Sequence, residues 1–146
     1  MPQSMTELGA VPVLLGIDPG KDKCGLAAVG EDGTVRQMMV VPAAEIVSVI
    51  QRWVEEAPVL ALVVGDRSTG KVLAQRLEVL DVPLYLVPEH ESTLRGCRLY
   101  FQDHPPQGLM RFVPLSFQVP PRPIDDYAAL VIVQDWLRVQ NSPEAV

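Results

Sequence analysis

The chain has 146 residues, of which 48% are hydrophobic and 21% are charged, a composition typical of one folded domain and not of a disordered segment. Its two cysteines lack the spacing of a zinc site, so we expect two reduced thiols. We expect the fold to be stabilised by its core and not by a structural metal or disulfides. The net charge is −6, no apolar run approaches the ~18 residues of a membrane span, and no basic region of a secretory signal is present, so we expect a cytoplasmic protein.

The N-terminal half of the chain predicts three strands followed by a helix. The apolar run 11–18 has the pattern of a buried central strand and ends in the carboxylate Asp18. Segments 24–30 and 34–41 flank an Asp-Gly turn signal and therefore predict a hairpin. Residues 43–57 carry apolar side chains at helical spacing.

The C-terminal half alternates strand and helix. The expected strands are 59–65 and 82–88, and the expected helices are 69–80, 91–101 and 124–139. Residues 102–123 contain six prolines and predict a long loop, which in a compact domain is usually functional or disordered. We expect a single domain over 11–140, between a flexible lead-in at 1–10 and a tail at 141–146.

This order of elements, βββαβαβα, predicts an α/β fold with a mixed five-stranded sheet and helices on both of its faces. A right-handed crossover after the third strand favours a place for the first strand near the centre. Binding sites in such sheets form at the carboxyl ends of central parallel strands. That rule selects three places in this chain: Asp18, Gly65–Arg67 and Glu89.

Carboxylates stand at the predicted strand ends and at the start of the last helix. Asp18 precedes Pro-Gly, which suits either an ordinary turn or a metal ligand beside exposed backbone amides. Glu89 suits either a helix-capping role or a ligand, and the same holds for Asp125 and Asp126. Asp125 shares a helix face with Ala128 and Ala129, whose small side chains allow a close approach to the sheet.

Three segments resemble the RuvC and YqgF branch of the RNase H-like nucleases, in the order of that family. LLGIDPGKDKCGLAAVG is similar to the family's opening strand and hairpin. PEHESTLRGCRLYF resembles the segment with a glutamate four residues before a threonine, here Glu89 and Thr93. RPIDDYAALVIVQDWL resembles the last helix, with an aspartate three residues before an Ala-Ala pair, here Asp125.

The resemblance implies an RNase H-like fold and a metal-dependent nuclease acting on structured DNA or RNA. Asp18, Glu89 and Asp125 would be the catalytic residues and would hold two Mg²⁺ or Mn²⁺ ions for phosphodiester hydrolysis. Metal bound by three carboxylates would also reduce the effective charge from −6 to −3, which eases the approach of nucleic acid. The cations expected to contact substrate phosphates are Lys21, Arg67, Lys71 and Arg95.

The chain departs from the family pattern at the second ligand. His90 stands where the family usually has an arginine, and Glu91 offers a second carboxylate beside Glu89. The choices between Glu89 and Glu91, and between Asp125 and Asp126, therefore stay open. His90 is a further candidate for proton transfer.

Two other functions compete with the nuclease. GDRSTGK, at 65–71, nearly matches a nucleotide-binding P-loop, but Val72 stands where that motif needs a hydroxyl for Mg²⁺. An RNase H-like domain that binds nucleic acid without cutting it is the second alternative.

If the chain is a nuclease, two substrates remain open. Resolution of branched DNA junctions needs a symmetric dimer, whereas trimming of a ribosomal RNA precursor needs one active site. A monomer and a homodimer are both compatible with the sequence, with Trp136 and Leu137 as candidate contacts if exposed.

Overall fold

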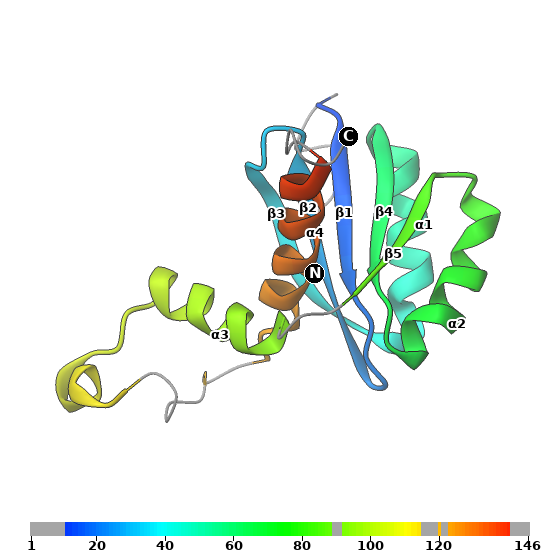
Figure 1. The fold of residues 1–146 in the computed structure, drawn as a ribbon. Helices are drawn as coiled ribbons and strands as arrows, with labels where there is room; N and C mark the ends of the chain where they lie inside the picture. The colour runs from blue at the N-terminus through cyan, green and yellow to red at the C-terminus, as the bar shows by residue number, and fades with distance from the viewer. Residues whose placement is uncertain (1–10, 89–91, 115–119, 121–122, 141–146) are drawn as a thin grey trace.

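The structure, a computed structural model, describes residues 11–88, 92–114, 120 and 123–140. Its centre is one mixed sheet with the strand order β3-β2-β1-β4-β5 (Figure 1). The strands are β1 (Val13–Asp18), β2 (Lys23–Gly30), β3 (Val35–Pro42), β4 (Val59–Gly65) and β5 (Leu84–Val87). β1 to β3 form an antiparallel meander, and β4 and β5 continue the sheet in parallel with β1. The predicted mixed sheet with the first strand at its centre is confirmed.

Helices cover both faces of this sheet, as expected. The helical elements are α1 (Ile46–Glu56) after the 3₁₀ turn η2 (Ala43–Glu45), α2 (Ser68–Leu77) before η3 (Glu78–Leu80), α3 (Ser92–Asp103), η4 (Gly108–Phe112) and α4 (Asp125–Gln140). α1 and α2 pack on one face and α4 packs on the other. η4 lies inside the segment 102–123 that was predicted to be a loop.

The pleat of β1 divides its side chains between two apolar cores. Leu15 and Ile17 point to the core formed with α1 and α2. Leu14 points to the core formed with α4. Because successive side chains of a strand alternate between faces, Gly16 and Asp18 lie on the α4 side as well. The carboxylate that ends β1 therefore faces α4.

Two strand glycines bring α4 unusually close to the sheet. A Cβ atom added at Gly16 would lie 2.5 Å from the carbonyl oxygen of Ala129, and one added at Gly25 would lie 1.7 Å from the carbonyl oxygen of Asp125. Real Cβ atoms do not approach this closely, so both positions require glycine. These contacts set the height of the first half of α4 above β1 and β2.

The helix that follows β5 packs against α4. Gly96 lets α3 approach α4, since an added Cβ would lie 3.0 Å from the backbone nitrogen of Ala128. The Tyr127 hydroxyl donates a hydrogen bond of 2.7 Å to the Asp103 carboxylate at the end of α3. Figure 1 shows α3 and η4 extending away from the sheet as an arm.

The two candidate dimer contacts differ in exposure. Leu137 is buried and therefore does not meet the condition set for such a contact, whereas Trp136 is half-buried with its ring centroid 5.1 Å from that of Tyr85. The oligomeric state stays a prediction. In the described segments, no helix is long and apolar enough to cross a membrane. The predictions for 1–10 and 141–146 lie outside the described residues.

Candidate active site at the carboxyl end of the central strand

Asp18 is the last residue of β1 and is only 7% exposed. It pairs across the antiparallel ladder with Gly25 of β2. The turn between these strands begins with Pro19 and Gly20, so the chain reverses immediately beyond the carboxylate. The strand thus holds Asp18 at the edge of the sheet while its side chain faces α4.

Asp125 lies beside Asp18 because α4 begins directly above Gly25. The backbone of Asp125 packs on the space where Gly25 has no side chain, and Gly25 is the cross-strand partner of Asp18. The first turn of α4 and the carboxyl end of β1 therefore meet at the same edge of the sheet (Figure 1). Two acidic residues more than a hundred positions apart in sequence are thereby brought to the same end of the sheet.

Charges at this end of the sheet shift the pKa values of two groups. Burial is the main cause that raises the pKa of the Cys24 thiol, and the carboxylates of Asp18 and Asp125 raise it further because they disfavour a thiolate. Burial also raises the pKa of Asp125, and Asp126 adds to this, whereas the positive charge of Lys23 opposes it. Asp18 and Asp125 therefore both contribute negative charge at the carboxyl end of β1.

The structure distinguishes the two adjacent aspartates of α4. Asp126 is 5% exposed and accepts a hydrogen bond of 3.0 Å from the backbone N–H of Tyr127. Asp125 is half-buried, so part of its carboxylate is open to solvent. Asp125 is thus the more accessible of the two carboxylates, and the choice between them as a metal ligand stays a prediction.

The third predicted carboxylate, Glu89, lies outside the described residues, as do His90 and Glu91. β5 ends two residues earlier, at Val87, and it runs parallel to β4 and hence to β1. The chain therefore leaves β5 at the edge of the sheet where Asp18 lies. No set of three His, Cys, Asp or Glu side chains within the described part of the chain forms a metal cluster, so the trio stays a prediction.

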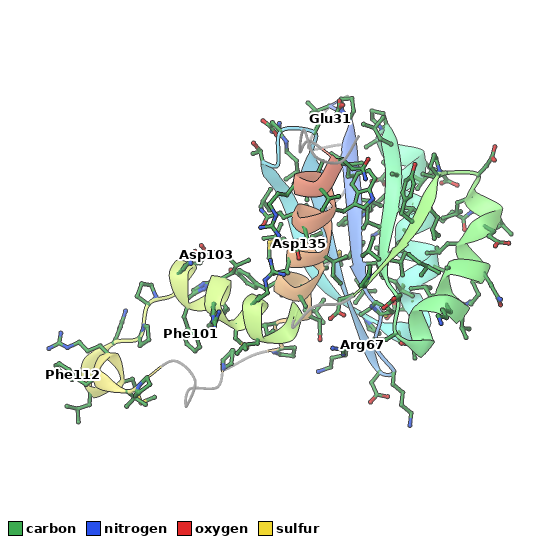
Figure 2. All side chains as sticks on the ribbon, viewed as in Figure 1. Glu31, Arg67, Phe101, Asp103, Phe112 and Asp135 are labelled. Atoms are coloured by element: carbon green, nitrogen blue, oxygen red, sulfur yellow. The ribbon has the colours of Figure 1, made fainter. Side chains whose placement is uncertain are left out.

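The four cations predicted to contact substrate do not all lie near the candidate carboxylates. Lys21 is exposed in the turn after Asp18, and Arg67 is exposed just after β4, near the same end of the sheet (Figure 2). Lys71 is exposed on α2. Arg95 instead forms a two-pronged ion pair with Asp135, at 2.5 and 2.6 Å. Asp135 lies ten residues along α4 from Asp125, roughly 15 Å at the helical rise, so the structure does not bring Arg95 to the carboxylates.

Lys23 is a further cation at this end of the sheet. It begins β2, and its positive charge opposes the rise in the pKa of Asp125. The sequence signal was weak, because Lys23 is one of several cations near a turn. Only the docking of α4 on β2 reveals which carboxylate it accompanies.

The segment that resembles a P-loop does not form one. β4 ends at Gly65 and α2 begins at Ser68, so only two residues connect them. A P-loop needs a longer glycine-rich loop whose backbone amides wrap the phosphates. Gly70 lies in the first turn of α2, where an added Cβ would be 1.9 Å from the Gly65 carbonyl oxygen. Glycine is required at position 70 because α2 lies close to the carboxyl end of β4.

No known family model matches the chain, and no curated protein matches it. Among solved structures, Thermus thermophilus RuvC aligns over 88% of this chain and 95% of its own, at 19% identity and a TM-score of 0.50. The fold is similar to that of RuvC. The same protein in complex with a Holliday junction substrate aligns over 88% and 94% of the two chains, at 19% identity and a TM-score of 0.48. At this identity the likeness to RuvC shows a similar fold alone, and function must be argued from the site.

Asp125→Asn is expected to stabilise the protein at neutral pH. The raised pKa of Asp125 means that the folded state favours its protonated form, so stability falls as the pH rises from the ordinary value of 3.8 through the raised value. Asparagine carries no charge to desolvate, and the variant should therefore melt at a higher temperature at pH 7. Thermal melts across pH should show this advantage disappearing below 3.8. An unchanged or lower melting temperature at pH 7 would contradict the assigned environment of Asp125.

Proposed function

We propose that this chain is a metal-dependent nuclease that hydrolyses phosphodiester bonds in structured nucleic acid. The observation that carries the proposal is the convergence of Asp18 and Asp125 at the carboxyl end of the central strand, with Gly25 between them. Open α/β sheets bind their ligands at the carboxyl ends of the parallel strands. Structural roles alone do not require acids from two distant segments to lie at the same end of the sheet.

The donor set suits Mg²⁺ or Mn²⁺, which prefer carboxylate oxygens. Asp18 and Asp125 would hold the metal, and Glu89 is proposed as the third ligand. A divalent ion bound there supplies Lewis-acid stabilisation of the phosphoryl oxygens and lowers the pKa of the attacking water. The rigid supports of the two carboxylates, β1 and the first turn of α4, keep them in place without reorganisation.

The cations around this edge are proposed to position the nucleic acid. Lys21 and Arg67 follow the carboxyl ends of β1 and β4, and Lys71 lies one turn into α2. Exposed lysine and arginine side chains of this kind bind phosphates without reading sequence. Arg95 is less suited to that role because Asp135 holds its guanidinium on α4. Branched DNA and a ribosomal RNA precursor both remain proposed substrates.

A cleavage panel tests the proposal. Four-way DNA junctions, single-stranded DNA and structured RNA would be incubated with the protein in Mg²⁺, in Mn²⁺ and in chelator. We expect cleavage of at least one structured substrate with either metal and none in chelator, because the carboxylates alone provide no electrophile. Absence of cleavage of every substrate would contradict the nuclease and favour a domain that only binds nucleic acid.

A further inference from the structure

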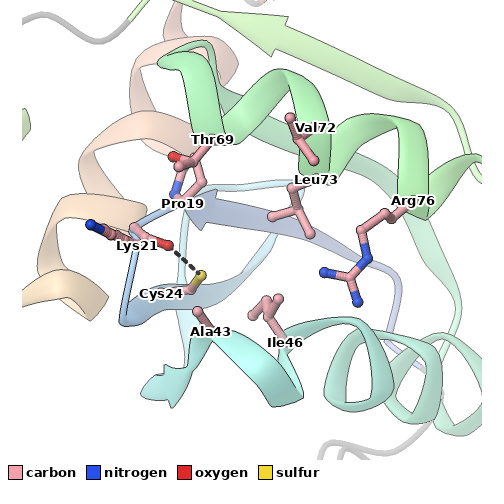
Figure 3. A pocket seen from close by; sticks show the side chains of 10 residues that line it. Pro19, Lys21, Cys24, Ala43, Ile46, Thr69, Val72, Leu73 and Arg76 are labelled. Atoms are coloured by element: carbon pink, nitrogen blue, oxygen red, sulfur yellow. Dashed lines mark hydrogen bonds between the residues drawn. The ribbon is translucent and has the colours of Figure 1, made fainter.

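A cavity of about 390 Å³ lies on the opposite face of the sheet from α4, between α1 and α2. Its floor contains the buried side chains of Cys24, Ile46 and Leu73, and its rim is the turn after β1 (Figure 3). The volume is at the lower end of the range for small-molecule sites, so it suits one compact ligand.

The charge of this cavity is unusual for this chain. The protein has 18 acidic residues and 12 lysines and arginines, yet no acid lines the cavity. Arg76 supplies positive charge at one end of the cavity, and Lys21 lies at the other end with its side chain directed away from the cavity (Figure 3); neither forms an ion pair within the described residues. Figure 3 shows the Arg76 guanidinium directed from α2 toward α1. A ligand with a negative group is therefore favoured over a cation or a neutral molecule.

The remaining walls are apolar and face each other. Ile46 stands at the start of α1, and Val72 and Leu73 stand on α2, with Val72 60% exposed. Paired apolar walls of this kind can hold a flat ring, as in the pockets that receive an unstacked base. The Thr69 hydroxyl adds one polar group. The cavity thus combines apolar walls that can hold a planar ring with the positive charge of Arg76, which can bind a phosphate.

The cavity and the candidate active site share one structural element. Pro19 and Gly20 line the cavity and directly follow Asp18 in sequence. A nucleic-acid strand that crosses this edge of the sheet at Asp18 therefore meets the cavity mouth on the other side of the turn.

We propose that the cavity between α1 and α2 binds a single nucleotide, with the base between the apolar walls and the phosphate at Arg76. The nucleotide is either an unpaired one of the nucleic-acid substrate, which rests on the proposed function, or a free mononucleotide. If the first source applies, the preferred substrate carries an unpaired nucleotide next to the cleaved bond.

Nuclear magnetic resonance of the ¹⁵N-labelled full chain in chelator tests this binding without any cleavage. Thymidine 5′-monophosphate and adenosine 5′-monophosphate should shift the backbone amide signals of Thr69, Leu73 and Arg76. Thymidine alone and inorganic phosphate should each bind more weakly, because each supplies half of the contacts. Arg76→Gln should weaken mononucleotide binding by about tenfold or more, the usual effect of losing a charged hydrogen bond. Arg76 is exposed, so this variant is expected to fold.

Two matched variants locate the site. Arg52→Gln removes an exposed arginine of α1 that does not line the cavity and should leave mononucleotide binding unchanged. A loss confined to Lys71→Ala would place the phosphate at the start of α2 and overturn the proposal. Amide shifts confined to the α4 side of the sheet, or no shifts at all, would overturn it too.

Oligonucleotides separate the two sources of the nucleotide. If the substrate supplies it, a duplex with one unpaired nucleotide should shift the cavity amides, and a fully paired duplex of equal length should not. Shifts with mononucleotides but with neither duplex assign the cavity to free nucleotides. Because chelator prevents cleavage, these results stand independently of whether Asp18 is found to be catalytic.

Discussion

Replacing Asp18 by asparagine is expected to reduce metal-dependent cleavage by roughly a thousandfold, since the carboxylate helps to hold a cation whose stabilisation of the transition state amounts to several kcal/mol. Asparagine matches aspartate in shape but removes the charge. The buried position at the end of β1 should therefore stay filled, and the variant should fold and bind nucleic acid much as the native chain does. Initial cleavage rates at saturating Mn²⁺, with binding measured separately in chelator, report the two effects.

The matched control is Asp22→Asn, which removes an exposed carboxylate from the same turn. It changes the net charge equally and should leave the cleavage rate near that of the native protein. If Asp18→Asn cleaves as fast as Asp22→Asn, Asp18 does not act in the reaction and the proposed site is wrong.

Gly25→Ala should have the largest structural effect, because its methyl group would lie 1.7 Å from the Asp125 carbonyl oxygen. The first turn of α4 must move away from β2 to make room. Overpacking of this kind typically costs about 1–3 kcal/mol, which for a domain of this length corresponds to a fall in melting temperature of about 3 to 10 °C. The same movement separates Asp125 from Asp18, so cleavage should fall even at temperatures where the variant is folded.

Gly30→Ala on the same strand is the control for this substitution. Its added methyl group meets no backbone atom but the ends of two exposed side chains, Asp32 at 2.9 Å and Arg36 at 3.4 Å, which can shift at the cost of weakening the hydrogen bond that Asp32 accepts from the Thr34 N–H. Calorimetry should show a change within about 0.5 kcal/mol. A Gly25→Ala protein as stable and as active as Gly30→Ala would show that α4 does not rest on Gly25.

The arrangement of the sheet could be predicted because it follows from local patterns. The apolar run 59–65 matched β4 residue for residue, and the Asp-Gly turn at 32–33 identified the hairpin of β2 and β3. The central place of β1 followed from the handedness of one crossover. These features depend on periodicity and chain connection, which a sequence displays directly.

The surroundings of the site were less predictable because they depend on contacts between distant segments. Asp125 and Asp126 differ by one step around a helix, and their different burial depends on how α4 packs on the sheet, which the sequence does not display. Arg95 was predicted to contact substrate phosphates, yet its partner is Asp135, forty residues later. The short connection between β4 and α2, which removes the P-loop, depended on where the helix begins.

Anomalous diffraction from a crystal soaked in Mn²⁺ tests the central claim most directly. We expect an anomalous peak bonded to carboxylate oxygens of both Asp18 and Asp125, at the carboxyl end of β1. A crystal with no manganese there, or with the two side chains directed away from each other, would contradict a shared cation site and with it the proposed nuclease.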